Sequence, residues 1–360
     1  MIATRPADHY REIAALTRAP VALMEVCGTH TMAIARHGLR SRLPPALALL
    51  SGPGCPVCVT PAAELDRAAL LAREPGVTVA IFGDLLRVPG SLSSLERERA
   101  AGADVRIVYS PRDALAMAAA DRARLVVFLG AGFETTSPLV AATLVRAREE
   151  AIENFLVLPV FRLIPPAMAA LAADPRARIA GFLCPGHVST ILGTRPYEGL
   201  ARAHRMPCVV AGFAPGEILR ALVLLLRQIA ESRAEVENAY ETAVRPEGNP
   251  TARALLDRVF RVADADWRGI GRLPGSGLEL REEYRRHDAR ARIPVALPAA
   301  APDFERGCAC GAVMQGRCAP ADCAHFGTEC LPAHPRGPCM VSSEGACAAH
   351  WRYGGAFRHG

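Results

Sequence analysis

The sequence of 360 residues predicts an α/β protein, with two similar parallel-sheet α/β domains and a third, mostly helical or irregular domain that carries a C-terminal iron–sulfur cluster. Short, continuous apolar runs alternate with helical stretches through the first two-thirds of the chain, which is typical of parallel sheets covered on both faces. Helical patterns predominate after residue 215. Seven of the twelve cysteines fall within the last 53 residues, a density of thiols that is typical of a soft metal centre.

The apolar runs form two blocks, each predicted to be one domain. Residues 21–113 hold expected strands at 21–26, 46–50, 77–82 and 105–109 and helices at 31–43 and 61–73. Residues 114–215 hold expected strands at 125–129, 155–161, 179–183 and 208–211 and helices at 138–150 and 165–173. Residues 216–360, with an N-terminal helix in 1–20, form the third expected domain, with helices at 217–227, 234–243 and 251–262, loops at 246–250 and 273–277, and a linker at 297–302.

Composition excludes several classes of protein. The first twenty residues are charged and lack a continuous apolar core, so we expect no secretory signal. The densest apolar stretch, 218–229, is too short and too charged for a membrane span. A net charge of +6 is mild, and only 5% of residues are aromatic, whereas nucleic-acid binding favours a basic stripe interleaved with aromatics. We therefore expect a cytoplasmic protein that binds neither nucleic acid nor membrane and uses its cysteines as metal ligands or redox groups.

Unusual motifs follow five of the expected strands. They are residues 27–30 (CGTH), 52–58 (GPGCPVC), 83–84 (GD), 130–136 (GAGFETT) and 184–189 (CPGHVS). In open α/β sheets, ligands bind outside the carboxyl ends of the strands. We therefore expect one or two clefts lined by Cys, His, Glu and Thr.

The first two motifs carry the upstream thiols. Cys27 and His30 place a thiol and an imidazole three residues apart, close enough to share a metal ion, and the helix start after them favours thiolate. The alternative is a buried structural cysteine beside a helix-capping threonine. Cys55 and Cys58 form a CxxC motif, which can form a redox disulfide or bind a soft metal. Half of a zinc site, completed by Cys27 and His30, is the alternative for this pair.

Glu134 and His187 are candidates for proton handling. The loop at 130–136 lacks the lysine of a P-loop and the spacing of a dinucleotide fingerprint. Glu134 could act as a general base or as a partner for a histidine, and a structural turn is the alternative. His187 is predicted to act in the cleft, or else to be a loop histidine whose hydrogen bonds are satisfied.

The tail holds a second candidate metal centre. Cys308, Cys323, Cys330 and Cys347 have the spacing C-x14-C-x6-C-x16-C, which is not a zinc-finger spacing, and four thiolates can complete a cubane cluster. Three further cysteines, at 310, 318 and 339, are surplus, so composition does not select the four ligands. A zinc site with spare thiols is the alternative.

Together these motifs resemble the HypD family of hydrogenase maturation proteins. The matching stretches are residues 24–31, 51–60, 132–136, 185–189, 308–311, 322–323, 326–327 and 337–349, so the resemblance runs from about residue 20 to the end. Cys318 departs from the family pattern. The family fold, two similar α/β domains plus a third that carries the cluster, agrees with the pattern of expected elements.

The resemblance implies a scaffold on which the Fe(CN)2CO fragment of nickel–iron hydrogenases is assembled. Such proteins work with a small HypC-type chaperone, receive cyanide from a HypE-type donor charged by HypF, and serve the hydrogenase large subunit indirectly. A 4Fe–4S cluster is then expected on Cys308, Cys323, Cys330 and Cys347. Cys27, with His30 beside it, corresponds to the position that holds the nascent iron.

A mechanism follows as a hypothesis. The cluster would supply electrons, and Cys55 and Cys58 would relay them by dithiol–disulfide exchange to cleave a thiocyanate group. Glu134 and His187 would handle protons or hydrogen-bond the iron ligands. This is a redox-active scaffold rather than a conventional turnover enzyme. The rival functions are an iron–sulfur-dependent thiol–disulfide oxidoreductase and a zinc-stabilised interaction protein.

Overall fold

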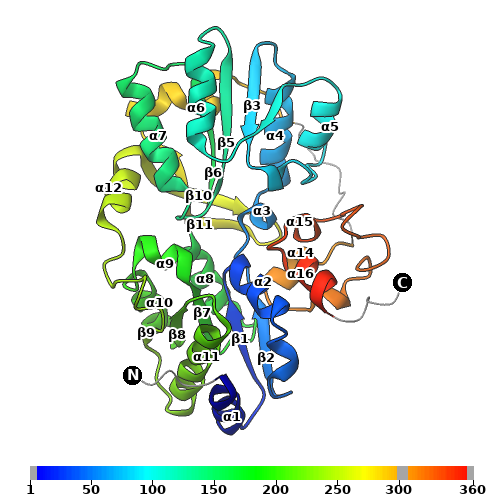
Figure 1. Ribbon diagram of the computed structural model, residues 1–360, viewed down its shortest axis with the longest axis vertical. Coiled ribbons are helices and arrows are strands. Elements are labelled where there is room, and N and C mark those ends of the chain that lie inside the picture. The colour runs from blue at the N-terminus through cyan, green and yellow to red at the C-terminus, as the bar shows by residue number, and fades with distance from the viewer. Residues whose placement is uncertain (1–5, 298–306, 355–360) are drawn as a thin grey trace.

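The computed structural model describes residues 6–297 and 307–354. Two lobes, each built on a parallel sheet, lie end to end, and a cysteine-rich unit packs against the side of their junction (Figure 1). The predicted linker at 297–302 lies outside the described residues from residue 298 onward. The expected class, two parallel-sheet α/β units with a helical and irregular C-terminal region, is confirmed.

The first sheet has five parallel strands in the order β2-β1-β7-β8-β9. They are β1 (Val21–Glu25), β2 (Leu47–Ser51), β7 (Gly181–Pro185), β8 (Cys208–Ala211) and β9 (Val236–Asn238). The helices of this lobe are α1 (Pro6–Leu16), α2 (Gly28–Arg36), α8 (Ile164–Ala173), α9 (Gly186–Leu192), α10 (Pro196–His204) and α11 (Pro215–Ala230), with a 3-10 turn η1 (Arg40–Arg42). Because α11 packs on β7 and β8 and α1 packs on α11, the central strands are buried.

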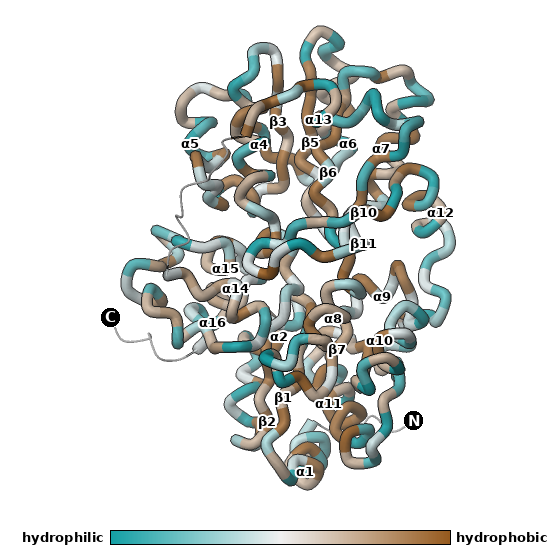
Figure 2. The backbone as a smooth tube through the Cα atoms, turned by 180° about the vertical axis from the view of Figure 1, so that it is seen from behind, coloured by the Kyte–Doolittle hydropathy of each residue, from teal (hydrophilic) through white to brown (hydrophobic). Residues whose placement is uncertain are grey.

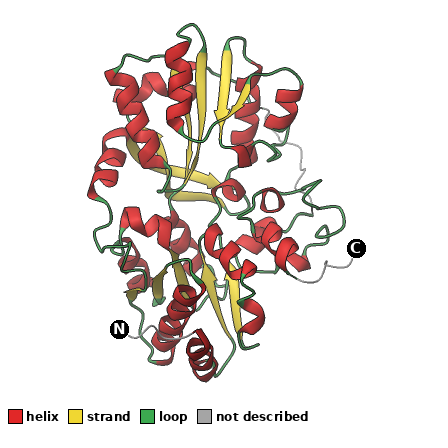
Figure 3. Cartoon of the chain, in the orientation of Figure 1, coloured by secondary structure: helices red, strands yellow, loops and turns green. Residues whose placement is uncertain are grey.

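The second sheet has four parallel strands in the order β4-β3-β5-β6. They are β3 (Val77–Ile81), β4 (Val105–Ile107), β5 (Leu125–Gly132) and β6 (Phe155–Phe161). The helices of this lobe are α4 (Ala62–Arg73), α5 (Leu95–Ala100), α6 (Pro111–Ala120), α7 (Ser137–Glu149), α12 (Pro250–Val259) and α13 (Ala289–Arg292), with 3-10 turns η2 (Gly83–Leu85) and η3 (Glu282–His287). Figure 3 shows these strands flanked by helices, as their continuous apolar sequences predict.

The remaining elements meet at the junction of the lobes. They are α3 (Pro56–Val59), the antiparallel pair β10 (Phe260–Trp267) and β11 (Gly271–Leu280), and the tail elements α14 (Cys310–Met314), η4 (Pro320–Asp322), α15 (Pro338–Val341) and α16 (Ala346–Tyr353). The backbone of Arg268 at the hairpin turn donates to Val59 at the end of α3, over 2.9 Å. In the tail, α16 packs on α2 and α15 packs on α3. The tail therefore contacts both segments that carry upstream cysteines.

The two sheets do not follow the predicted blocks 21–113 and 114–215. Strand β1 pairs with β7, and β3 pairs with β5, so each sheet takes strands from both blocks. The physical reason is that apolar periodicity locates a strand but does not select its neighbour. The first sheet takes its strands from two separated stretches of chain, the strands of the second sheet lie between them in sequence, and the chain returns to the second lobe with α12, η3 and α13.

Local predictions around residue 240 were also wrong. The helix expected at 234–243 is replaced by β9, which pairs with β8 at the edge of the first sheet, and the helix expected at 251–262 ends at Val259, where β10 begins. The loop expected at 273–277 lies inside β11. β9 is stabilised by pairing with β8, and β10 and β11 by pairing with each other in a hairpin, so strand pairing outweighs the local helix or loop pattern.

The apolar core is continuous through the junction. One cluster contains Val79 of the second sheet, Phe182 of the first and Met340 of the tail, each at most 2% exposed. Figure 2 shows α11 and the central strands as hydrophobic segments and several outer loops as hydrophilic. Among the described helices, none has the length and apolar character needed to cross a membrane.

Candidate functional site

Cys27 lies in the turn between β1 and α2, where the CGTH motif meets the GPGC motif. The backbone N–H of Gly28 donates to the carbonyl of Gly54 over 2.8 Å. A Cβ atom at Gly54 would overlap the backbone of Cys27, so only glycine fits there. The backbone N–H groups of Thr29 and His30, at the start of α2, lie near the Cys27 sulfur and lower the pKa of its thiol. The fold thus brings together the two upstream motifs, as their positions after adjacent strands predict.

Burial, however, controls the protonation of Cys27. Its side chain is 7% exposed, and desolvation raises the pKa of the thiol to about 12, with the nearby Glu25 carboxyl adding to the shift. The backbone N–H groups at the start of α2 lower the pKa of this thiol, as expected, but by less than burial raises it. A bound metal ion would reverse the balance, because a coordinating thiol loses its proton outright. The site therefore favours a neutral thiol until a cation arrives.

Glu25 is a buried carboxyl group that the sequence analysis did not single out. Its Oε1 accepts a hydrogen bond from Thr31 Oγ1 over 2.6 Å, and its Oε2 accepts one from the backbone of Cys27 over 3.2 Å. Desolvation raises the pKa of Glu25 to about 7. A glutamate ending the apolar strand at 21–25 was the available signal. This residue fixes the turn that presents Cys27.

The structure brings His187 together with His30. The Nε2 of His30 lies 2.9 Å from the carbonyl oxygen of Gly212, and the ring is fully buried. The rings of His30 and His187 both pack on Phe213, with centroids 4.7 Å and 4.0 Å away. Burial lowers the pKa of His30 to about 4 and also lowers the pKa of His187. Both rings are therefore neutral at pH 7.

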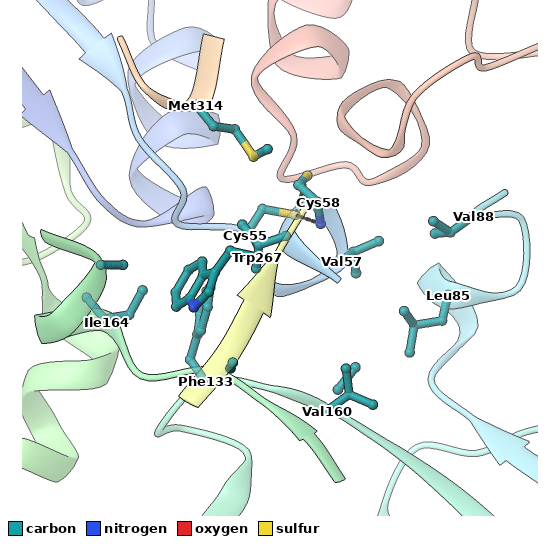
Figure 4. Packing of buried hydrophobic residues seen from close by; sticks show 14 of the residues in the cluster. Cys55, Val57, Cys58, Leu85, Val88, Phe133, Val160, Ile164, Trp267 and Met314 are labelled. Atoms are coloured by element: carbon teal, nitrogen blue, oxygen red, sulfur yellow. Dashed lines mark hydrogen bonds between the residues drawn. The ribbon is translucent and has the colours of Figure 1, made fainter. Parts of the chain in front are cut away.

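The CxxC pair lies at the junction of the lobes, on the short helix α3. Cys55 begins the helix, and its sulfur accepts a hydrogen bond from the backbone of Cys58 over 3.3 Å. The two sulfurs are 2.6 Å apart. Figure 4 shows them in an apolar core beside Phe133, Trp267 and Met314. Burial raises the pKa of Cys58. The dithiol is shielded from water, and its partners in this structure are groups of the same chain.

Those partners are tail residues. The thiol of Cys55 donates to Ser342 Oγ over 3.3 Å, and the thiol of Cys339 lies close enough to that of Cys58 to alter its pKa. The thiols of Cys310 and Cys347 in turn lie close enough to Cys339 to alter the pKa of its thiol. Thiols are therefore in contact from the CxxC pair into the tail. Sequence reasoning left Cys310 and Cys339 as surplus, because only the fold places them between the two centres.

The four expected cluster ligands lie in this tail unit. The sulfurs of Cys330 and Cys347 both feel the charge of Cys308, and a Cβ at Gly337 would lie 2.8 Å from the Cys308 sulfur. Cys323 is half-buried on the loop that leads to Cys330. Within residues 6–297 and 307–354, no three His, Cys, Asp or Glu side chains are grouped as ligands of one metal ion. A cubane takes one thiolate on each of four irons, so its ligands surround the cluster instead of meeting at one atom, and thiols are the donors that such a group takes.

An acidic residue of the tail lies beside Cys27. Glu344 of the tail accepts a hydrogen bond from Thr29 Oγ1 over 2.9 Å, and its Cβ would lie 2.5 Å from a Cβ at Gly28. Partial burial, followed by the charge of Glu344, raises the pKa of Asp84. The GD motif after β3 therefore lies on the side of the site where Glu344 is found. The turn that holds Ser342 and Glu344 contacts both upstream thiol motifs.

Glu134 occupies a separate position. Its Oε1 accepts a hydrogen bond from the backbone of Ile164 at the start of α8, over 2.9 Å. Its Oε2 has no partner among the described residues, and desolvation raises its pKa to about 7. Within the described part of the chain, neither Cys27 nor the two histidines hydrogen-bond to Glu134. The geometry favours a helix-capping role.

The fold and site define a class of protein: a two-lobed parallel α/β protein with a buried dithiol joined through further thiols to a cysteine-rich tail. The chain belongs to the HypD family, described as the hydrogenase formation hypA family, whose family model matches residues 5–354.

Curated relatives agree over nearly the whole chain. The hydrogenase maturation factor HypD of Rhodobacter capsulatus is 46% identical over 348 residues, covering 96% of this chain and 92% of that protein. HypD of Azotobacter vinelandii is 46% identical over 339 residues, covering 92% and 89%. A putative hydrogenase expression/formation protein of Methanocaldococcus jannaschii is 41% identical over 331 residues, covering 92% and 91%. The resemblance stated from the motifs is thereby confirmed.

Proposed function

We propose that this chain is a hydrogenase maturation factor that acts as an assembly scaffold for the Fe(CN)2CO fragment, together with a HypC-type chaperone and a HypE-type cyanide donor charged by HypF. The observation that carries the proposal is the line of contacting thiols from Cys310 through Cys339 to Cys58. This line of thiols ends beside Cys55, which donates to Ser342. Ser342 shares a turn with Glu344, and Glu344 accepts a hydrogen bond from Thr29 in the Cys27 motif. The residues proposed to supply electrons and the residues proposed to bind iron would thus be linked through one turn of the tail.

The iron fragment is the cargo, and Cys27 with His30 would hold it. Soft thiolate suits low-spin iron that carries cyanide and carbon monoxide. When iron replaces the thiol proton of Cys27, the N–H groups of Thr29 and His30 are already placed to stabilise the sulfur's negative charge. His187, neutral and exposed to solvent, would hydrogen-bond cyanide or pass protons outward.

The CxxC dithiol would cleave the carrier's thiocyanate. The sulfur–cyanide bond of the carrier breaks, and Cys55 and Cys58 become a disulfide. The two electrons and two protons given up by the dithiol convert the thiocyanate into one carrier thiol and one molecule of hydrogen cyanide. Hydrogen cyanide then binds iron as cyanide and releases its proton. The disulfide is then reduced by exchange, because Cys339 contacts Cys58 and Cys310 contacts Cys339. This exchange leaves Cys310 and Cys339 as the oxidised pair.

The tail would hold the resident cofactor. A 4Fe–4S cluster, which Cys308, Cys323, Cys330 and Cys347 would hold, would supply the two electrons, one at a time, that together with two protons return the Cys310–Cys339 disulfide to thiols. The chain's own contribution is to keep the dithiol dry, since Cys58 is 1% exposed, and to keep Cys339 against it.

The test is infrared spectroscopy of anaerobically purified protein with its small chaperone, alongside iron, zinc and sulfide analysis. Cyanide and carbonyl stretches, with iron in excess of one cubane, support the scaffold. Cys27→Ala should lose these bands and keep the cluster, whereas Cys323→Ala should lose the cluster absorbance. Bands that persist in Cys27→Ala would refute the role of that thiol.

A second function is favoured by the same thiol contacts. An iron–sulfur-dependent thiol–disulfide oxidoreductase would use Cys58, Cys339 and the cluster but would need neither Cys27 nor His30. A cubane's worth of iron and sulfide without cyanide bands would select it. A colourless protein with zinc and no sulfide would instead indicate a zinc-stabilised interaction protein.

A further inference from the structure

The segment after β8 places an aromatic ring between the two histidines of the site. Phe213 packs against His187 with an interplanar angle of 27° and against His30 with an angle of 31°. Tyr240 meets the same ring edge-on, with centroids 6.0 Å apart and an angle of 83°. One side chain therefore restrains both imidazoles, although His30 lies on α2, which follows β1, and His187 lies on α9, which follows β7.

The residue before Phe213 determines which nitrogen of His30 is free. A backbone carbonyl can only accept a hydrogen bond, so the 2.9 Å contact with the carbonyl of Gly212 requires the proton on Nε2. In the neutral ring, Nδ1 is then a bare lone pair, and this buried atom has no partner among the described residues. A buried polar atom without a partner indicates a ligand that completes the site.

We propose that Phe213 is a positioning residue that holds His30 and His187 for the iron cargo and leaves Nδ1 of His30 as the atom available to the iron or its ligands. This inference rests on the proposed scaffold function. Gly212 and Phe213 act as a two-point clamp, in which the carbonyl fixes the tautomer and the ring fixes the plane. Groups that orient metal-binding side chains in this way typically contribute about 10- to 100-fold to metal affinity or activity.

Histidine NMR on the iron-free protein tests the clamp directly. Protein labelled with 15N-histidine is compared as wild type, Phe213→Leu and Phe213→Tyr, with resonances assigned through His30→Gln and His187→Gln. Phe82→Leu is the matched control, since Phe82 is also half-buried and meets one aromatic ring edge-on in the other lobe. If Phe213→Leu does not fold, Phe213→Met replaces it, because a flexible thioether fills irregular space.

We expect wild-type His30 to show a neutral ring with the proton on Nε2. In Phe213→Leu both tautomers should appear at His30 and the signals of His187 should move, while Phe213→Tyr and Phe82→Leu stay like wild type. Identical histidine spectra in Phe213→Leu and wild type would overturn the proposal, as would a wild-type His30 protonated on Nδ1.

Infrared spectra of the same variants, purified with the chaperone, separate this inference from the proposed function. Phe213→Leu should reduce the cyanide and carbonyl bands about ten-fold or more, and Phe213→Tyr should restore them. Full bands in Phe213→Leu would overturn the positioning role. If wild-type protein has no such bands, the scaffold function fails, while the histidine spectra still decide whether the clamp exists.

Discussion

Replacing Glu134 by glutamine should stabilise the protein at pH 8 and leave it nearly unchanged at pH 4.5. Burial raises the pKa of Glu134 from 4.5 to about 7. The folded protein therefore binds more protons than the unfolded chain between these pH values, so the free energy of unfolding falls as pH rises through that window. The difference between 4.5 and about 7 corresponds to about 3 kcal/mol. Glutamine removes this loss, because it carries no charge and still offers an oxygen to the Ile164 N–H.

Urea unfolding of wild type and Glu134→Gln at the two pH values measures the effect. Glu25 has its pKa raised to about 7 as well, but it is present in both proteins and cancels in the difference. Glu283→Gln is the control, because this side chain is exposed on η3. A difference between wild type and Glu134→Gln that is the same at pH 4.5 and pH 8 would refute the reasoning. If the variant is also fully active in cargo assembly, Glu134 is a structural cap and not a proton carrier.

Three further predictions concern the thiol sites. Gly54→Ala should destabilise the protein by about 3 kcal/mol, because the added Cβ meets the backbone of Cys27. The control Gly199→Ala, which has open space around it on α10, should stabilise the protein by up to about 1 kcal/mol. Equal melting temperatures of the two variants would contradict this prediction. With a pKa of about 12, about one Cys27 in 10⁴ is thiolate at pH 8, so iodoacetamide should label it slowly in iron-free protein, as judged by mass spectrometry; rapid labelling would argue against burial. Cys339→Ala should slow reduction of the oxidised CxxC pair at least ten-fold relative to Cys318→Ala in stopped-flow measurements, and equal rates would exclude Cys339 from the relay.

The positions of the strands and the chemistry of their ends could be predicted from the sequence. The apolar runs at β1, β5, β6 and β7 are continuous because these strands are buried on both faces. The Cys27 and Cys55 motifs then meet because parallel neighbours end at the same edge of a sheet.

What the sequence could not supply was the relation between distant segments. The pairing of β1 with β7 joins residues far apart in the chain, and nothing in either apolar run specifies the other. The contact of Cys339 with Cys58 and the packing of Phe213 between two histidines depend on that same arrangement. Glu25 was visible as a charge ending an apolar strand, but its bond to the Cys27 backbone was not.

The inserted arrangement of the lobes has a consequence for synthesis on the ribosome. Residues 77–161 can complete the second sheet while β1 and β2 still await β7, because β7 is translated only afterwards. The tail emerges last, and until Cys339 and Ser342 arrive the CxxC pair lacks its covering partners. The nascent chain therefore exposes its dithiol to cellular reductants for most of translation, and closure of the tail is the event that isolates it. A ribosome-bound chain stalled before residue 339 should be readily alkylated at Cys55 and Cys58, whereas the released protein should not.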